Sequence, residues 1–465
     1  MEPFPLQFFA AACNATLRAA RPETPVHRIS TDTRSLQPGD LFVAISGDRF
    51  DGHQYVEAAI QRGAVAAVVS DRHADRYRGL PLVVTTDPRR ALGRMASRYR
   101  SQFRIPVAAI AGSNGKTSTK EILAAILGEC FETLRSPESF NNDIGVPLTI
   151  FGLEQRHVAA VIEVGTNHPG ELAPLLRIAQ PRLGVLTHIG EEHLEYFGSV
   201  AGVIEEEGWI ADLLPPDGVL VMPGDQPWSD AIASRCRARI IRVGYGARSQ
   251  WRCLEVDSDA DGSTFTVRAP NPDLSGEYRV NLLGRHQVSN ALLAIAAAAE
   301  FGLGRTEIQR GLARALPAKW RMNRWQLDGV EVLEDCYNAN LDSMLAALET
   351  LRQFPCPGRR VAVLGAMAEL GGHASRAHAA VGRRAAELRL DRLVGIGDAA
   401  SLTVEVAAEH GLGQAVSFDS LETAALALRS YLRPGDCLLI KGSRSARLER
   451  LGSLLREPSC LQHAA

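Results

Sequence analysis

Residues 107–127, VAAIAGSNGKTSTKEILAAIL, constrain the fold more than any other stretch of the chain. An apolar run of strand length ends in a Gly-rich turn, and the segment after the turn has a helical pattern. Gly112 and Gly115 allow unusual backbone angles that let N–H groups converge on an anion, and Lys116 and Thr117 follow directly. The pattern therefore predicts a strand–loop–helix unit of an α/β fold, with a phosphate-binding loop at the start of the helix.

The loop is a shortened form of the usual phosphate-binding motif. The pattern GxxxxGK[ST] is not met, because Ile110 stands where the first glycine would be, and the chain reads GxxGK[ST]. The lysine can reach the β and γ phosphates of a nucleotide, and the threonine can coordinate magnesium. No lysine follows an asparagine, so the guanine-reading Asn-Lys-x-Asp motif is absent and ATP is favoured over GTP. The loop residues expected to bind ATP are Gly112, Ser113, Asn114, Gly115, Lys116, Thr117 and Ser118.

The chain divides into three predicted domains. At 465 residues it is too long for one hydrophobic core. Residues 1–104 have the pattern of a small mixed α/β unit, and residues 105–317 that of a P-loop ATPase domain with a parallel sheet and antiparallel hairpins at one edge. Residues 318–465 have the pattern of a Rossmann-like domain. We therefore expect an α/β fold class throughout.

Composition narrows the classes of partner. A formal net charge of −2 supplies no clustered basic surface, so we expect no nucleic-acid partner. The N-terminus lacks a basic export signal, and no apolar stretch has the length of a membrane span, so we expect a cytoplasmic protein without membrane insertion. The eight cysteines, Cys460 included, are scattered without a CxxC pair, which argues against a disulfide framework or zinc site.

Lysine is rare in this chain. Only four of its 51 basic residues are lysines, namely Lys116, Lys120, Lys319 and Lys441. A lysine in such a background marks a position where an ammonium group is wanted, although chance retention in an arginine-rich sequence explains any single one as well.

Seven ordered motifs between residues 26 and 446 resemble the Mur ligases of bacterial cell-wall synthesis. They are SNGKTSTKE, SFNNDIGVPLT, IEVGTNHPGEL, LTHIGEEHLEYFGS, GRHQVSNALLAIAAA, EDCYNANLDSM and IKGSR. The resemblance implies an ATP-dependent peptide ligase that activates a carboxylate as an acyl phosphate for attack by an amine. CYNAN is similar to the members that join D-alanyl-D-alanine to UDP-MurNAc-tripeptide, whereas the Asp-Asn-Pro-Arg of the ligase for the third amino acid is absent.

The resemblance also implies a magnesium site. Thr117, Glu163 and His193 match the metal ligands, and both Glu163 and His193 fall just past strand ends, where open α/β sheets hold ligands. Each of the last two is also explained as an ordinary strand-end carboxylate or surface histidine. The expected catalytic residues are Lys116, Glu163, His193, Glu207 and Arg321.

One departure from the family pattern concerns residue 207. Many Mur ligases carry a carbamylated lysine there, but this chain has no lysine between Lys120 and Lys319. Our hypothesis is that Glu207 supplies the carboxylate directly. Glu205 or Glu206 is an alternative register, and a solvated acidic helix face is the simpler interpretation.

The remaining expected contacts follow from the same resemblance. His286 and Asn290, four residues apart on one helical face, match the ribose and adenine end of the nucleotide, although Asn290 as a helix cap is the alternative. Arg321 and Asp335 match nucleotide contacts of the third domain. The expected substrate residues are Ser30, Asp32, Arg34, Asn141, Asn142, Asn338, Asn340, Ser343 and Lys441, of which the asparagines also suit plain turns.

Other function classes remain open at this point. A P-loop kinase of a small acceptor, a Mur-type ligase with another amine and a nucleotide-gated binding protein each explain the loop. We expect a monomer. The sequence does not determine whether the tripeptide ends in diaminopimelate or lysine, because no recognisable motif reads that side chain.

Overall fold

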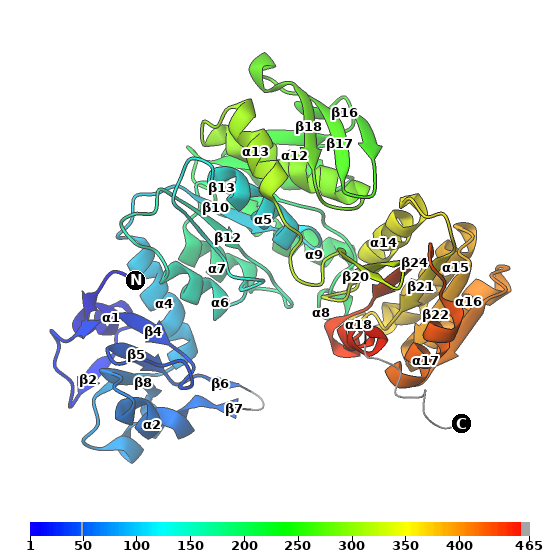
Figure 1. Ribbon diagram of the computed structural model, residues 1–465. Helices are drawn as coiled ribbons and strands as arrows, with labels where there is room; N and C mark the ends of the chain where they lie inside the picture. The colour runs from blue at the N-terminus through cyan, green and yellow to red at the C-terminus, as the bar shows by residue number, and fades with distance from the viewer. Residues whose placement is uncertain (48–49, 457–465) are drawn as a thin grey trace.

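The computed structural model describes residues 1–47 and 50–456. Its α/β domains form three lobes, with the central one above the N-terminal lobe on the left and the C-terminal lobe on the right (Figure 1). The predicted α/β class with three domains is therefore confirmed. No helix in the described ranges is long and apolar enough to cross a membrane.

The N-terminal lobe is built on a mixed sheet. Its strands run in the order β2 (Thr16–Arg18), β9 (Leu82–Thr85), β8 (Ala66–Ser70), β5 (Asp40–Val43) and β4 (Arg28–Ser30). Short antiparallel pairs join β1 (Phe4–Pro5) to β3 (Pro25–Val26) and β6 (Ser46–Gly47) to β7 (Phe50–Asp51). The helices are α1 (Leu6–Ala12), α2 (Val56–Gln61), α3 (Asp71–Ala74) and α4 (Pro88–Arg100).

Helix α4 links this lobe to the central one. Asp87 caps it by accepting the backbone N–H groups of Arg89 and Arg90, and Pro88 occupies the first turn, where its missing N–H costs nothing. Arg89 forms an ion pair with Asp143 of the central lobe. The helix thus presents a basic face along the boundary between the two lobes.

The central sheet carries the phosphate loop. Its order is β11 (Thr133–Arg135), β12 (Ala159–Glu163), β10 (Val107–Ala111), β13 (Leu183–Leu186), β14 (Val219–Pro223), β15 (Arg239–Gly244), β16 (Trp251–Ser258), β17 (Ser263–Arg268) and β18 (Gly276–Val280). The pairings from β11 to β16 are parallel, and β16–β17–β18 are antiparallel, which confirms the predicted edge hairpins.

Helices cover both faces of this sheet. On one side lie α5 (Lys116–Leu127), α12 (Arg285–Glu300) and α13 (Arg305–Arg314), which pack on one another. The other helices are α6 (Gly145–Ile150), α7 (Leu172–Ala179), α8 (Leu194–Phe197), α9 (Val200–Glu207), α10 (Trp209–Leu213) and α11 (Ser229–Arg235). Burial on both faces explains why the parallel strands are continuously apolar.

The C-terminal lobe has the predicted doubly wound pattern with one unforeseen strand. The sheet order is β19 (Asn323–Leu327), β20 (Val330–Asp335), β24 (Cys437–Lys441), β21 (Arg360–Leu364), β22 (Arg392–Ile396) and β23 (Ala415–Phe418). Strand β19 is an antiparallel edge that the sequence did not predict, because its alternating pattern is short and none of its residues is fully buried. The helices are α14 (Leu341–Gln353), α15 (Ala374–Glu387), α16 (Asp398–Glu409), α17 (Leu421–Tyr431) and α18 (Glu449–Arg456).

The cysteines of the described part are all free, and Cys460 lies outside the described residues. Burial raises the pKa of the Cys253 thiol to about 11, which keeps it protonated near neutral pH.

Candidate active site at the phosphate loop

The loop between β10 and α5 has the backbone that its sequence predicts. Gly112 and Gly115 take φ angles of 119° and 90°. A Cβ at Gly115 would lie 2.4 Å from the Asn290 Oδ1 atom, so the close approach of α12 also requires glycine there. The first helical hydrogen bond runs from Thr119 N–H to the Gly115 carbonyl, which leaves the N–H groups at the start of α5 for an anion.

The side chain of Lys116 folds back over this loop. Its ammonium group donates to the carbonyl oxygens of Gly112 and Ser113, the latter at 3.1 Å. It also lies 3.7 Å from Glu192 Oε1. A largely buried cation therefore stands where the helix start favours a phosphate.

Glu163 lies beside the loop at the end of β12. Its Oε1 atom accepts from the Thr117 hydroxyl at 3.1 Å and from Asn141 Nδ2 at 2.9 Å. Its Oε2 atom is buried without a hydrogen-bond donor and lies 3.8 Å from the ammonium group of Lys120. The structure thus brings together Thr117, Glu163 and Asn141, which are far apart in the chain.

His193 occupies the position before α8, in the left-handed backbone region at φ 49°. Its side chain is 12% exposed, and burial lowers the pKa of the imidazole, an effect that the neighbouring Glu369 carboxylate opposes. Nδ1 contacts the carboxylate of Glu369 from the C-terminal lobe, and Nε2 lies 3.9 Å from Glu192 Oε2. One ring nitrogen therefore faces the other lobe, and the second faces the phosphate loop.

Two buried glutamates flank the loop. Burial raises the pKa of Glu192 to about 8 and that of Glu207 to about 7, while Lys116 partly offsets both shifts. Each keeps one buried oxygen without a hydrogen-bond donor. Glu192 is a site residue that sequence reasoning missed, although the two acids in front of His193 were a usable signal.

The three consecutive glutamates of α9 have different surroundings. Glu207 Oε2 accepts the backbone N–H of Gly112 at 2.7 Å, so this residue supports the phosphate loop. Glu206 is bound to backbone N–H groups near the start of α7, and the side chain of Glu205 is 77% exposed and paired with Arg235. The geometry therefore favours residue 207 over the alternative registers.

This donor set fits a divalent cation. Magnesium prefers carboxylate and hydroxyl oxygens. Glu163 offers one oxygen that accepts from the Thr117 hydroxyl and a second buried oxygen that lacks a hydrogen-bond donor. Thr117 and Glu163 would hold the ion, and His193, which lines the same cavity, is the third ligand that the family resemblance implies. When bound, it would neutralise the charge of nucleotide phosphates.

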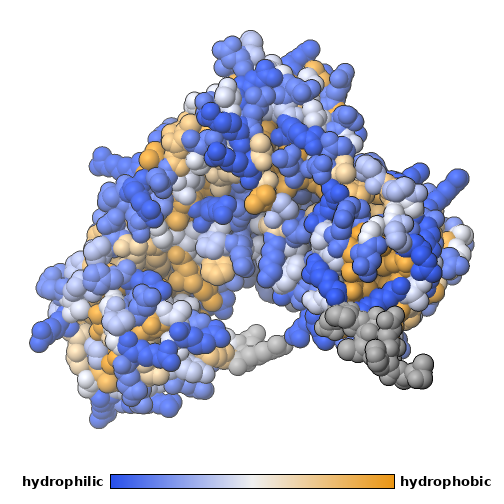
Figure 2. Space-filling view, in the orientation of Figure 1, coloured by the Kyte–Doolittle hydropathy of each residue, from blue (hydrophilic) through white to orange (hydrophobic). Residues whose placement is uncertain are grey.

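Two cavities meet at the loop. The larger, of about 810 Å³, lies between α4, α7, the loop and the C-terminal lobe. The smaller, of about 400 Å³, lies between α12 and the C-terminal lobe. Asn114, Gly115 and Arg321 line both cavities. The surface is hollowed where the lobes meet (Figure 2).

The smaller cavity collects the residues expected at the nucleotide. Among its lining residues are Ser118, His286, Asn290 and Asp335. Ser343 and Lys441 line it too, although both were expected at the substrate. Asn290 lies within α12 and not at its end, so the alternative that it caps the helix is wrong. Lys441 was expected near the substrate but is buried, and its ammonium group pairs with Asp335 Oδ2 at 2.6 Å. This ion pair holds the ends of β20 and β24 together.

The larger cavity collects part of the expected substrate residues. Asn141, Asn142 and Asn338 line it. The Asn142 side chain also accepts the N–H of Gly145 at 2.8 Å, which fixes the start of α6. The cavity wall adds arginines of α4 and α7 that sequence reasoning did not single out, namely Arg89, Arg90, Arg94 and Arg177.

Asn340 and Ser343 form a reciprocal capping box at the start of α14. The turn role that we weighed for these residues is therefore present. The Asn340 side chain also exchanges two hydrogen bonds with Asn114 of the phosphate loop. Asn340 thus contacts the loop directly.

The structure does not bring Ser30, Asp32 and Arg34 to the loop. Ser30 is the last residue of β4 and the other two follow that strand, and none of the three is among the described residues that line either cavity. Asp32 and Arg34 form an exposed ion pair, in which Arg34 holds the pKa of the Asp32 carboxyl at about 2.

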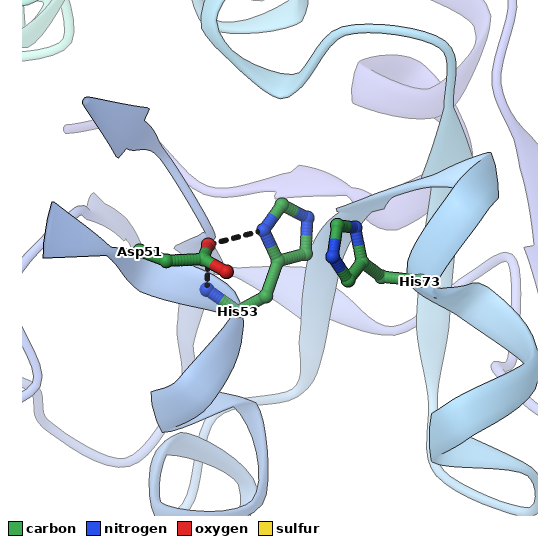
Figure 3. Close-up of side chains that lie close together, drawn as sticks. All are labelled: Asp51, His53 and His73. Carbon is green, nitrogen blue, oxygen red and sulfur yellow. Dashed lines mark hydrogen bonds and ion pairs between the residues drawn. The ribbon is translucent and has the colours of Figure 1, made fainter. Parts of the chain in front are cut away.

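A second cluster of potential metal ligands lies in the N-terminal lobe. Asp51, His53 and His73 place ligand atoms within 4.8 Å of one another. His53 Nδ1 bonds Asp51 at 2.8 Å and its Nε2 accepts the N–H of Ser70, while His73 Nδ1 bonds the Ser70 hydroxyl. The imidazole rings stack at an interplanar angle of 22°, so their lone pairs do not converge (Figure 3). We interpret the cluster as a hydrogen-bond network that fixes β7 against β8.

Comparisons with known proteins cover nearly the whole chain. Residues 25–100 match the Mur ligase family catalytic domain, residues 110–298 the Mur ligase middle domain, and residues 320–444 the Mur ligase glutamate ligase domain. The UDP-N-acetylmuramoyl-tripeptide--D-alanyl-D-alanine ligase of Escherichia coli (strain K12) is 36% identical over 435 residues, which is 92% of this chain and 93% of that protein.

Solved structures agree. A crystal structure of MurF from Acinetobacter baumannii has a TM-score of 0.90 at 32% identity and covers 98% of this chain and 99% of that one. MurF ligase from Thermotoga maritima in complex with ADP has a TM-score of 0.79 at 24% identity, covering 92% and 96% of the two chains, and shares the fold.

Proposed function

This chain belongs to the Mur ligase family, and from that premise we propose that it joins D-alanyl-D-alanine to UDP-MurNAc-tripeptide. The product is the UDP-MurNAc-pentapeptide used in peptidoglycan synthesis. The chain is an ATP-dependent amide ligase. One observation carries the assignment: the phosphate loop stands between a smaller and a larger cavity, and Arg321 borders both.

Each cavity suits one reactant. ATP occupies the smaller cavity, with its phosphates at the start of α5, and the Thermotoga maritima protein of the same fold binds ADP. The UDP-linked tripeptide occupies the larger cavity, where the arginines of α4 and α7 suit its anionic groups. The peptide carboxylate then meets the γ-phosphate beside Lys116. We propose a monomer as the working unit.

The chemistry requires positive charge at the loop. A carboxylate that attacks a triphosphate brings two anions together, so their repulsion must be offset. Lys116 and Arg321 supply cationic groups, and Glu163, Thr117 and His193 would hold magnesium, which would add further positive charge. The carboxylate takes the γ-phosphoryl group of ATP and ADP leaves, which gives an acyl phosphate. The amine of D-alanyl-D-alanine attacks the acyl carbon, and phosphate leaves with loss of the amine proton as the amide forms.

Glu207 replaces a carbamylated lysine in this proposal. Its carboxylate already bonds the loop at Gly112 and keeps a second oxygen free of protein donors.

We place the domain boundaries at residues 104/105 and 317/318, since these positions lie between α4 and β10 and between α13 and β19.

Phosphate release tests the assignment. Purified protein with ATP and magnesium is offered the UDP-tripeptide, D-alanyl-D-alanine, both or neither. We expect release and a condensed product only with both. A phosphorylated product formed with one acceptor alone would identify a kinase. ATP binding without release of phosphate would identify a binding protein. Either result contradicts the ligase assignment.

A further inference from the structure

Glu369 joins the C-terminal lobe to a proposed metal ligand of the central lobe. It lies in the loop after β21, and its carboxylate accepts from His193 Nδ1. The two residues are 176 positions apart in the chain. His193 Nε2 points the other way, since it lies 3.9 Å from Glu192 Oε2 and the residue lines the larger cavity. The two ring nitrogens therefore have separate tasks.

A second contact fixes Glu369 on the same helix. Its backbone carbonyl accepts the N–H of Glu195 at 3.1 Å, in the first turn of α8. Glu369 has a φ of 60°, a left-handed conformation that is unusual for a residue with a side chain. Both its main chain and its side chain thus contact the start of α8. Two independent hydrogen bonds fix the position of Glu369 there.

Proton placement gives this contact a chemical consequence. A neutral imidazole carries one N–H, and an acceptor at Nδ1 places the proton there. The lone pair is then on Nε2, the nitrogen that faces the phosphate loop. Carboxylates commonly orient metal-binding histidines in this way.

We propose that Glu369 is a positioning residue that holds His193 with its Nε2 lone pair directed at the cation site. The inference rests on the proposed role of His193 as a metal ligand. Because Glu369 belongs to the C-terminal lobe, its hydrogen bond forms only when that lobe is docked. Docking of the lobe therefore completes the cation site.

Another contact between the same lobes provides a control. Arg376 of α15 forms an ion pair with Glu191, and neither side chain contacts His193. Loss of this pair weakens docking without removing the acceptor at Nδ1. Arg376→Ala thus separates general docking from the specific hydrogen bond.

The test measures Mn²⁺ affinity of the full chain in the presence of ADP by electron paramagnetic resonance. We expect Glu369→Ala to weaken Mn²⁺ binding by about 10–100-fold. Glu369→Gln should recover much of this loss, because the amide oxygen still accepts from Nδ1, and Arg376→Ala should stay within about twofold of the parent. ¹⁵N NMR of labelled histidine should show the His193 proton on Nδ1 in the parent and redistributed in Glu369→Ala.

Two results would overturn the inference. Unchanged Mn²⁺ affinity in Glu369→Ala, with a clear loss in His193→Ala, leaves His193 as a ligand and removes the role of Glu369. Equal losses of Mn²⁺ affinity in Glu369→Ala and Arg376→Ala, with the His193 tautomer unchanged, would show that the Glu369 contact only helps the lobes to dock. If His193→Ala itself binds Mn²⁺ normally, the proposed metal role of His193 is wrong, and that failure is distinct from the first two.

Discussion

Asn114 of the phosphate loop and Asn340 of the C-terminal lobe exchange two side-chain hydrogen bonds, of 3.2 and 3.0 Å. Each amide donates once and accepts once. Asn340 also caps α14, so one residue ties the end of a helix in one lobe to the phosphate-binding loop of another. Nucleotide binding and lobe docking are therefore linked at this pair.

The Asn114–Asn340 contact predicts an effect on nucleotide affinity that can be separated from an effect on stability. Asn340→Ser keeps a capping side chain but is too short to bond Asn114, so we expect a severalfold weaker ADP affinity with nearly unchanged stability. Asn340→Ala should lose about 1 kcal/mol of unfolding free energy in addition. Calorimetric ADP titration and urea unfolding measure the two quantities. A double-mutant cycle with Asn114→Ala should reveal a coupling energy on the order of 1 kcal/mol, and additive effects would argue against the link.

Removal of the loop ammonium should abolish turnover without unfolding the protein. We expect Lys116→Ala to lower kcat by about 100-fold or more, because its ammonium group is the cation that lies directly on the phosphate loop. Its circular dichroism should match that of the parent. Lys319→Ala is the matched control, since Lys319 packs on the Trp320 ring away from both cavities. Equal kcat values for the two variants would contradict a catalytic role for the phosphate loop.

Independence from carbon dioxide follows from the role proposed for Glu207. We expect steady-state activity of the parent to be unchanged in buffers depleted of carbon dioxide, and Glu207→Ala to lose about 10–100-fold in kcat. Glu205→Ala, next to it on α9 but exposed, should retain parental activity. Loss of parental activity on depletion of carbon dioxide, or full activity of Glu207→Ala, would contradict the proposal that Glu207 replaces a carbamylated lysine.

The buried Glu192 should make the metal-free protein less stable as pH rises. A carboxyl group with a folded pKa of about 8 and an ordinary value of 4.5 binds more protons in the folded state between these limits. The unfolding free energy therefore falls from about pH 5 to pH 8, by an amount on the order of a few kcal/mol. Glu192→Gln cannot ionise and should reduce this dependence, leaving the smaller part that Glu207, with a pKa of about 7, contributes below that pH.

Urea unfolding with a chelator at several pH values measures this slope. Glu195→Gln is the control, because Glu195 is exposed on α8 and its removal should leave the parental slope. A Glu192→Gln profile parallel to that of the parent would show that Glu192 does not carry the buried proton.

The sequence by itself was sufficient to predict elements whose signal is local. The apolar run, two glycines, lysine and threonine of residues 107–127 predicted β10, the loop and α5. Glu163 was predicted at a strand end, and the structure has it as the last residue of β12. These predictions succeeded because neighbours along the chain determine strand periodicity, glycine angles and helix starts.

Tertiary structure alone decided how the site is completed. Glu192 faces Lys116, Asn340 reaches Asn114, and Glu369 binds His193, while Ser30, Asp32 and Arg34 lie away from both cavities. The pairs between lobes join residues 226 and 176 positions apart. Local periodicity contains no information on such contacts, because they depend on how separately folded sheets dock and on which strand ends then face each other.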